Sequence, residues 1–267
     1  MLKCHQSSQG NNKERMENHM KRRFSLILAV LLTLSLLAGC GGQTPETTAN
    51  TPETTAPAAA PETTAPAAVP ETTEPALQER ALSLGVVEGN TYTNAYAGFG
   101  CTLDEGWIVL PADQLQELPA IVQDSVSGTE IGEAMADVQQ FTDMMAENAD
   151  QLTNMNVLFT KLGLQERLMY QVLSEEDVLD ATLTQKDAMI EAYTAMGMNV
   201  TSMEKVTVTF LGQERFALKT TAETQGVACY MLQVFAYDLG EYSVTLTLTS
   251  FLEDNTESML ELFYAVE

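Results

Sequence analysis

The runs 206–210 and 242–249 place an apolar or aromatic residue at every second position, with a Ser or Thr between each pair. A period of two sends alternate side chains to opposite faces of a strand. Gly212 and the stretch Leu239-Gly240-Glu241 mark turns between such runs. The sequence therefore predicts an antiparallel meander from about residue 200 to 250, half-buried, with one apolar face and one hydroxylated face.

A helix is predicted immediately before this meander. Ser174 and Asp177 have the spacing of a capping box, and acids at 175–177 suit the positive end of the helix dipole. Apolar residues recur at helical spacing up to Gly197, which suits a left-handed C-terminal position. The stripe comprises Leu179, Leu183, Ile190 and Tyr193. This explains the acidic cluster without a metal.

Shorter elements complete the pattern. The stretch 91–111 reads as two short strands with glycine turns, and 155–162 is a further strand. A short helix is expected from Asp113, and a last helix from 254–256, with Met259, Leu260, Phe263 and Val266 inward. Periodicity alone favours one helix from about 130 to 150. We therefore expect an α+β fold, a two-layer sandwich with helices packed on one face of an antiparallel sheet.

The N-terminal region has the organisation of a secretion signal. Met20 is followed by three cations and by an apolar run, 24–37, too short to cross a ~30 Å hydrocarbon core as a helix. Residues 1–19 are polar, so translation starts either at Met1 or at Met20. The stretch Leu37-Ala38-Gly39-Cys40 resembles the lipobox of bacterial lipoproteins. The resemblance implies a signal peptide at 20–39 and cleavage before Cys40. It also implies a diacylglyceryl group on the Cys40 sulfur, with acyl chains such as palmitate, and anchoring outside the cytoplasm.

A tether is predicted after Cys40. Pro-Glu-Thr-Thr occurs four times between residues 45 and 73, joined by Ala-rich spacers. Such a segment buries too little apolar surface to offset the entropy of ordering. We expect residues 40–83 to be a disordered, low-complexity tether and residues 84–267 to form one domain.

Charge excludes some classes of partner. The chain has 13 Lys and Arg and 37 Asp and Glu; residues 1–40 hold six of those cations and two of those acids. The remainder thus carries 7 basic and 35 acidic residues, a net charge of −28. Nucleic acid and anionic lipid both require clustered cations, so we expect no nucleic-acid partner and no charge-driven membrane docking.

Catalytic patterns are sparse. His5 and His19 both precede Cys40, so a chain beginning at Cys40 has no histidine for a catalytic triad or a metal site. Cys101 and Cys229 are either bonded or free buried thiols. The pairs Asp104/Glu105 and Glu253/Asp254 are interpreted as turn residues. We expect no catalytic residue, no metal and no cofactor, and we interpret the eleven methionines after Cys40 mainly as core residues.

Landmarks along the domain resemble the PsbP-like superfamily, and in particular small lipoproteins of anaerobic bacteria that share its fold. They are Tyr92, Asn94, Gly98-Phe-Gly, Asp104-Glu-Gly-Trp107, the stretch 154–163, the stretch 206–216, and the Thr-rich strand before a terminal helix. This resemblance implies that Phe141 to Glu147 is a strand paired with 154–161 across a turn. We favour that hairpin over the helix, although periodicity alone leaves 140–148 open. No active site carries over.

Together these features predict a lipid-anchored, extracytoplasmic, non-enzymatic binding or accessory module of the cell envelope. Its ligand is either an envelope protein or a small molecule. The alternative is an extracytoplasmic hydrolase that uses only carboxylates on a glycan or peptide. An enzyme would show a cleft lined with acids, whereas a binding module would show an exposed apolar patch on the sheet.

Overall fold

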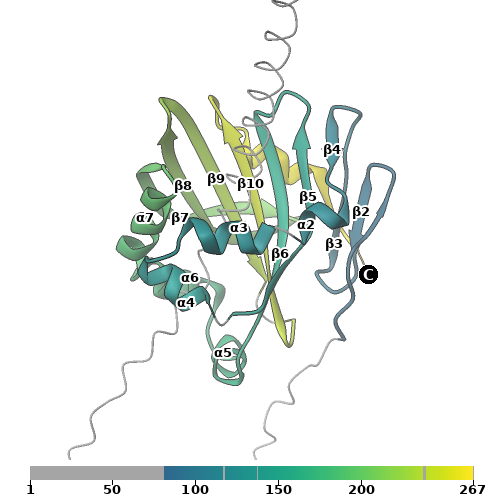
Figure 1. The fold of residues 1–267 in the computed structure, drawn as a ribbon. Coiled ribbons are helices and arrows are strands. Elements are labelled where there is room, and N and C mark those ends of the chain that lie inside the picture. Colours follow the sequence, from purple (N-terminus) through teal and green to yellow (C-terminus); the bar gives the residue numbers. More distant parts are fainter. Residues whose placement is uncertain (1–80, 117, 137, 237–238, 267) are drawn as a thin grey trace, which may run out of the picture.

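The structure, a computed structural model, describes residues 81–116, 118–136, 138–236 and 239–266. The predicted signal segment, Cys40 and most of the predicted tether lie outside these residues. The described residues form two antiparallel sheets, with most of the helices on one side of the larger sheet (Figure 1).

The larger sheet has seven strands, all antiparallel to their neighbours. In spatial order they are β4 (Trp107–Val109), β5 (Gln140–Asn148), β6 (Thr153–Lys161), β10 (Tyr242–Phe251), β9 (Val227–Ala236), β8 (Gln213–Thr224) and β7 (Asn199–Phe210). The smaller sheet comprises β1 (Val86–Glu88), β2 (Thr91–Asn94), β3 (Phe99–Thr102) and β11 (Phe263–Ala265). The predicted meander is therefore confirmed as β7 to β10.

The helices are short. They are α2 (Ala112–Leu115), α3 (Leu118–Ser125), α4 (Glu130–Met135), α5 (Leu164–Tyr170), α6 (Glu175–Leu183), α7 (Lys186–Ala195) and α8 (Thr256–Met259), followed by the 3-10 turn η2 (Leu260–Leu262). Figure 1 shows α2, α3, α4 and α6 in front of the large sheet, with α3 crossing the view of its central strands. The expectation of an α+β fold built on an antiparallel sheet is confirmed. Helices α2, α3, α4, α6 and α7 pack on one face of the large sheet, whereas α8 and η2 pack on the other face through Met259 and Leu260.

Two apolar cores lie on opposite faces of the large sheet. The first joins the helices, for example Val122 and Tyr193, to sheet residues such as Met231 and Phe235. The second joins the other face of the large sheet to the small sheet and to the C-terminal segment that follows β10. Strands β9 and β10 are thus covered on both faces, so the expectation of a half-buried sheet was wrong for them. Strand β7 is half-buried as expected, with Thr207 and Thr209 exposed between apolar residues that are buried or partly buried.

The stretch 140–148 is a strand, so the hairpin prediction is confirmed. Glu147 pairs with Asn154, and Gln151 takes a left-handed backbone conformation (φ 61°) in the turn. Met144, Met145 and Ala146 are all buried because both faces of β5 are covered. A strand buried on both faces has a continuous apolar sequence, which helical periodicity also fits.

Two predicted helices differ in the structure. The helix expected from 174 to 197 is divided into α6 and α7 near Thr184, whose hydroxyl donates to the Ala181 carbonyl (2.6 Å) at the end of α6. Such local bonds compete with helix continuation. The last helix ends earlier than expected, because Phe263 begins β11 and pairs with Cys101 in β3.

Asp143 fixes the start of the domain. The register of β5 shifts between Thr142 and Met144, and the Asp143 carboxylate between them accepts three kinds of donor. These are the Gly85 amide (2.9 and 3.0 Å), the Tyr92 hydroxyl (2.7 Å) and the Asn94 amide (2.7 Å). Burial, and then the neighbouring Asp143 charge, raise the pKa of Tyr92, so its hydroxyl remains a donor.

Asp143→Ala is predicted to lower the free energy of unfolding by about 2–4 kcal/mol, because it leaves the buried Tyr92 hydroxyl and the Asn94 amide without this acceptor. Chemical denaturation with and without the substitution measures the effect. Asp124→Ala, at an exposed position on α3, is the matched control and should change stability by less than about 0.5 kcal/mol. Equal effects of the two substitutions would contradict the role of Asp143.

Candidate ligand site between the helices and the large sheet

The helix-facing side of the large sheet carries buried polar side chains at its centre. Within the described residues there are ten of them, each at most 4% exposed, which we call the polar stripe. They are Glu147 on β5, Asn154, Asn156 and Thr160 on β6, Ser243, Thr245, Thr247 and Thr249 on β10, Gln233 on β9, and Thr220 on β8. The hydroxylated face expected from the alternating sequence therefore exists, but it is buried rather than solvated.

Strand register brings these residues together in cross-strand rows. One row runs from Glu147 through Asn154 to Thr249, and a second from Asn156 through Thr247 to Gln233. Residues directly opposite in antiparallel strands have Cβ atoms about 4.5–5.5 Å apart. The stripe is therefore a continuous surface along β6 and β10.

Apolar side chains frame the stripe on both sides. Met145 continues the second row on β5, and Leu218 continues it beyond Gln233 on β8. Both belong to the core shared with the helices, which establishes that the stripe faces the helix layer. A polar strip inside an apolar frame is the composition of a small-molecule site, where a few polar groups give orientation.

Several stripe oxygens have no hydrogen-bond partner among the residues that the structure describes. They are Asn154 Oδ1, Thr160 Oγ1, Thr220 Oγ1, Thr245 Oγ1 and Thr249 Oγ1. By contrast, Thr247 Oγ1 accepts from Gln233 Nε2 (3.4 Å). The unpartnered oxygens span three strands, so they do not reflect one misplaced side chain.

The energetic cost of such groups is large. A buried polar group without a partner costs about 1–3 kcal/mol, so five of them cost on the order of 5–15 kcal/mol, comparable to the whole stability of a typical domain. Buried polar groups in proteins are nearly always satisfied by protein, water or ligand. Water or a bound molecule at the stripe would supply the missing hydrogen bonds.

The helix layer is held unevenly over the stripe. Arg215 pairs with Glu175 (3.0 Å) and also donates to the Phe235 carbonyl, while Lys205 pairs with Glu176 and Asp180, so ion pairs fix α6 to the sheet. Among the described residues, the ion pairs that join helices α2 to α7 to the sheet strands all involve α6. The segment 112–136 is instead packed through apolar residues such as Leu118 and Val122.

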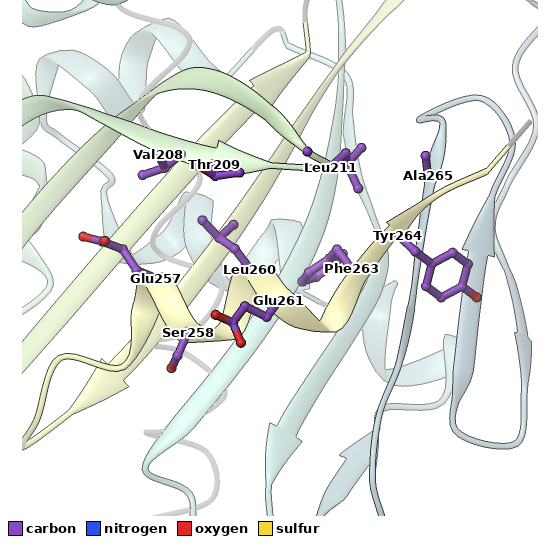
Figure 2. Close-up of a pocket in the computed structure, with 11 residues that line it drawn as sticks. Val208, Thr209, Leu211, Glu257, Ser258, Leu260, Glu261, Phe263, Tyr264 and Ala265 are labelled. Atoms are coloured by element: carbon purple, nitrogen blue, oxygen red, sulfur yellow. The ribbon is translucent and has the colours of Figure 1, made fainter.

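A second feature is a groove of about 580 Å³ between the end of β7 and the C-terminal segment. Figure 2 shows Leu260 and Phe263 directed toward the part of β7 that carries Val208 and toward Leu211. Glu257 and Glu261 lie along the same groove, and Glu257 pairs with Lys219 (3.1 Å). The groove combines an apolar floor with two carboxylates.

The two cysteines of the domain are both free and buried. Cys101 belongs to the core against the small sheet, and Cys229 to the core against the helices, so the large sheet separates them. Burial raises the pKa of Cys101 to about 11 and that of Cys229 to about 12. Neither thiol is therefore reactive near neutral pH.

The acidic pairs weighed in the sequence have structural roles. The side chain of Asp104 accepts from the Gly106 amide in the turn before β4 (2.8 Å). Asp254 pairs with Lys219 (2.8 Å) and accepts from Thr256 at the start of α8. Over the described part of the chain, no group of three or more His, Cys, Asp or Glu residues could hold a metal ion.

Comparison with known proteins gives no family for this chain. No protein-family model matches it, and no curated protein matches it significantly. No described helix has both the length and the apolar character needed to cross a bilayer. The predicted lipidation site, Cys40, lies outside the described residues, so it remains a prediction.

Sequence reasoning did not identify the stripe as a site. The signal was present at Asn154 and Asn156, two polar residues inside an otherwise apolar strand, and at the threonines of β10. Alternation alone predicts two faces, but it does not tell which element covers each one.

Replacing Thr245 and Thr249 together by Val is predicted to raise the free energy of unfolding by about 1–2 kcal/mol without added ligand, because both hydroxyl oxygens lack partners in the interior. Thr247→Val, on the same face of the same strand, should instead be neutral or destabilising, since it removes the acceptor for Gln233. Denaturant unfolding measures both. Loss of stability in Thr245→Val/Thr249→Val would contradict the absence of internal partners.

Proposed function

We propose that this protein is a lipid-anchored, extracytoplasmic binding module of the cell envelope, with the polar stripe as its ligand site. The observation that carries the proposal is the set of five buried, unpartnered oxygens on β6, β8 and β10. A binding site that hydrogen-bonds its ligand leaves such groups unsatisfied when it is empty. The PsbP-like resemblance supports a binding role, since the founding members of that superfamily assist a partner.

The chemistry of the stripe favours an uncharged polar ligand. Apart from the Glu147 carboxylate, its side chains are amides and hydroxyls, and none is a cation. An anionic ligand would therefore find no counter-charge within the stripe. Hydroxyl and amide groups of a neutral saccharide match these donors and acceptors, while the apolar frame suits the less polar face of a sugar ring.

Access to the stripe is expected from the side of the helix layer formed by 112–136. This segment contacts the sheet through apolar side chains, whereas salt bridges hold α6. Apolar contacts can shift without leaving charges unpaired, so displacement of α3 costs less than displacement of α6.

Neutral mono- and disaccharides, such as N-acetylglucosamine and maltose, should raise the melting temperature of the wild-type protein in a concentration-dependent way. A ligand at 100 times its Kd stabilises by about 2.7 kcal/mol. The variant Thr245→Val/Thr249→Val should fold and lose this response, while Thr207→Val, exposed on β7, should keep it. Equal responses from both variants would place the ligand elsewhere.

The location is supported by the Leu37-Ala38-Gly39-Cys40 sequence, which follows a cationic and apolar signal. Cys40→Ser removes the sulfur atom to which the lipid would be attached. The substitution should therefore move the protein from the membrane fraction to the extracytoplasmic fluid or medium. Immunoblotting of fractionated cells measures the shift. Unchanged membrane retention would contradict lipid anchoring at Cys40.

The hydrolase alternative has one observation in its favour, the groove of Figure 2 with Glu257 and Glu261 along it. A pair of carboxylates in a cleft is the arrangement that glycoside cleavage requires. However, Glu257 is paired with Lys219, and both glutamates are exposed. Catalytic acids usually lie in buried surroundings, which this groove does not provide. We therefore favour the binding role.

A further inference from the structure

Helix α5 and the turn after it expose a set of apolar side chains. Leu164 and Leu168 lie on α5 and Val172 in the turn just after it, at intervals of four residues, and they are 64%, 50% and 78% exposed. Helix α5 itself has no buried residue. A helix on a protein surface normally turns such a face toward the core. Contiguous exposed apolar side chains of this kind mark contacts with another protein or with a membrane.

The surroundings of α5 are less acidic than the rest of the chain. The stretch 161–173 contains Lys161 and Arg167 against a single acid, Glu166. Residues 41–267 have a net charge of −28, and acids pair with the domain cations Lys205 and Lys219. Arg167 on α5 also has an acidic neighbour, Glu241 at 4.0 Å, so the surroundings of α5 are close to neutral rather than cationic. An anionic bilayer therefore repels most of this surface but not α5.

The α5 helix lies at the end of the domain where the chain enters. Lys161, three residues before α5, pairs with Tyr242 at one end of the large sheet. Asp143, which binds the Gly85 amide, is close to the same end, because Gln140 pairs with Thr160. Figure 1 shows both α5 and the first described residues toward the lower part of the view. The described part of the chain thus begins on the α5 side of the domain.

We propose that the face of Leu164, Leu168 and Val172 contacts the surface of the bilayer to which the lipid on Cys40 is anchored. The inference rests on the proposed anchor and adds a defined orientation to it. The occupant is a bilayer rather than a protein because the chain enters on the α5 side and because the acidic remainder disfavours any other face. Leu82 and Leu84, in the first described residues of the chain, are also exposed apolar side chains.

The test uses the full, lipid-modified chain on vesicles of phosphatidylethanolamine and phosphatidylglycerol. An environment-sensitive fluorophore is attached at Val172→Cys or, as a control, at Gln225→Cys. Gln225 is exposed in the turn between β8 and β9, at the opposite end of the large sheet from α5. Cys101 and Cys229 are buried with raised pKa values, so they remain unlabelled in the folded protein.

We expect a blue shift and quenching by lipid-bound nitroxide at position 172 and neither at 225. With the label at 172, Leu164→Glu/Leu168→Glu should abolish the shift. The control Asn199→Glu/Gln225→Glu adds the same charge at exposed positions, at the end of the large sheet opposite α5. It should preserve the blue shift at position 172.

Flotation of the vesicles reports the anchor separately. A chain that floats with equal emission from both labels overturns the α5 contact but leaves the anchor intact. A chain that does not float contradicts the anchor and the α5 contact with it. The blue shift at position 172 could also appear without vesicles as the protein concentration rises. That result would assign this face to contact with a second copy of the chain, and it would overturn the proposal.

Discussion

The central strands of the large sheet are covered on both faces, and this constraint governs the rest of the molecule. One face of β10 is apolar and packs against the small sheet, as Val244, Leu246 and Leu248 do. The other face is hydroxylated and lies under helices that contribute mainly apolar side chains to the core. A purely structural interior would carry Val or Ile at those positions, since unmet hydrogen bonds are costly. The retained threonines and asparagines are therefore best explained by a ligand or by ordered water.

The two faces of the sheet thus have different roles. Against the small sheet, polar groups are satisfied: the Asp143 carboxylate accepts from Gly85, Tyr92 and Asn94, and this joins the entering chain to β5. Against the helices, five oxygens have no partner among the residues that the structure describes. Rigidity on one side and unmet hydrogen-bonding capacity on the other are consistent with a scaffold that holds a site in place.

Much of the architecture could be predicted from the sequence, because the strand period of 206–210 and 242–249 depends on residues close in the chain. The hairpin at 140–161 required the family resemblance, since Met144, Met145 and Ala146 fit a helix as well as a strand buried on both faces. The stripe could not be predicted, because the pairing of Glu147 with Asn154, and of Asn154 with Thr249, depends on contacts distant in sequence. The apolar face of α5 was missed for the same reason: which elements leave it uncovered is a tertiary property.

An experimental structure at high resolution, determined on protein purified from its own cells without stripping, tests the central claim most directly. The account predicts density for an uncharged polar molecule, with hydrogen bonds to Asn154, Thr245 and Thr249. A ligand-free structure should contain ordered water at these positions instead. A dry interior in which each of these oxygens is bonded to a backbone or side-chain group of the protein would contradict the account.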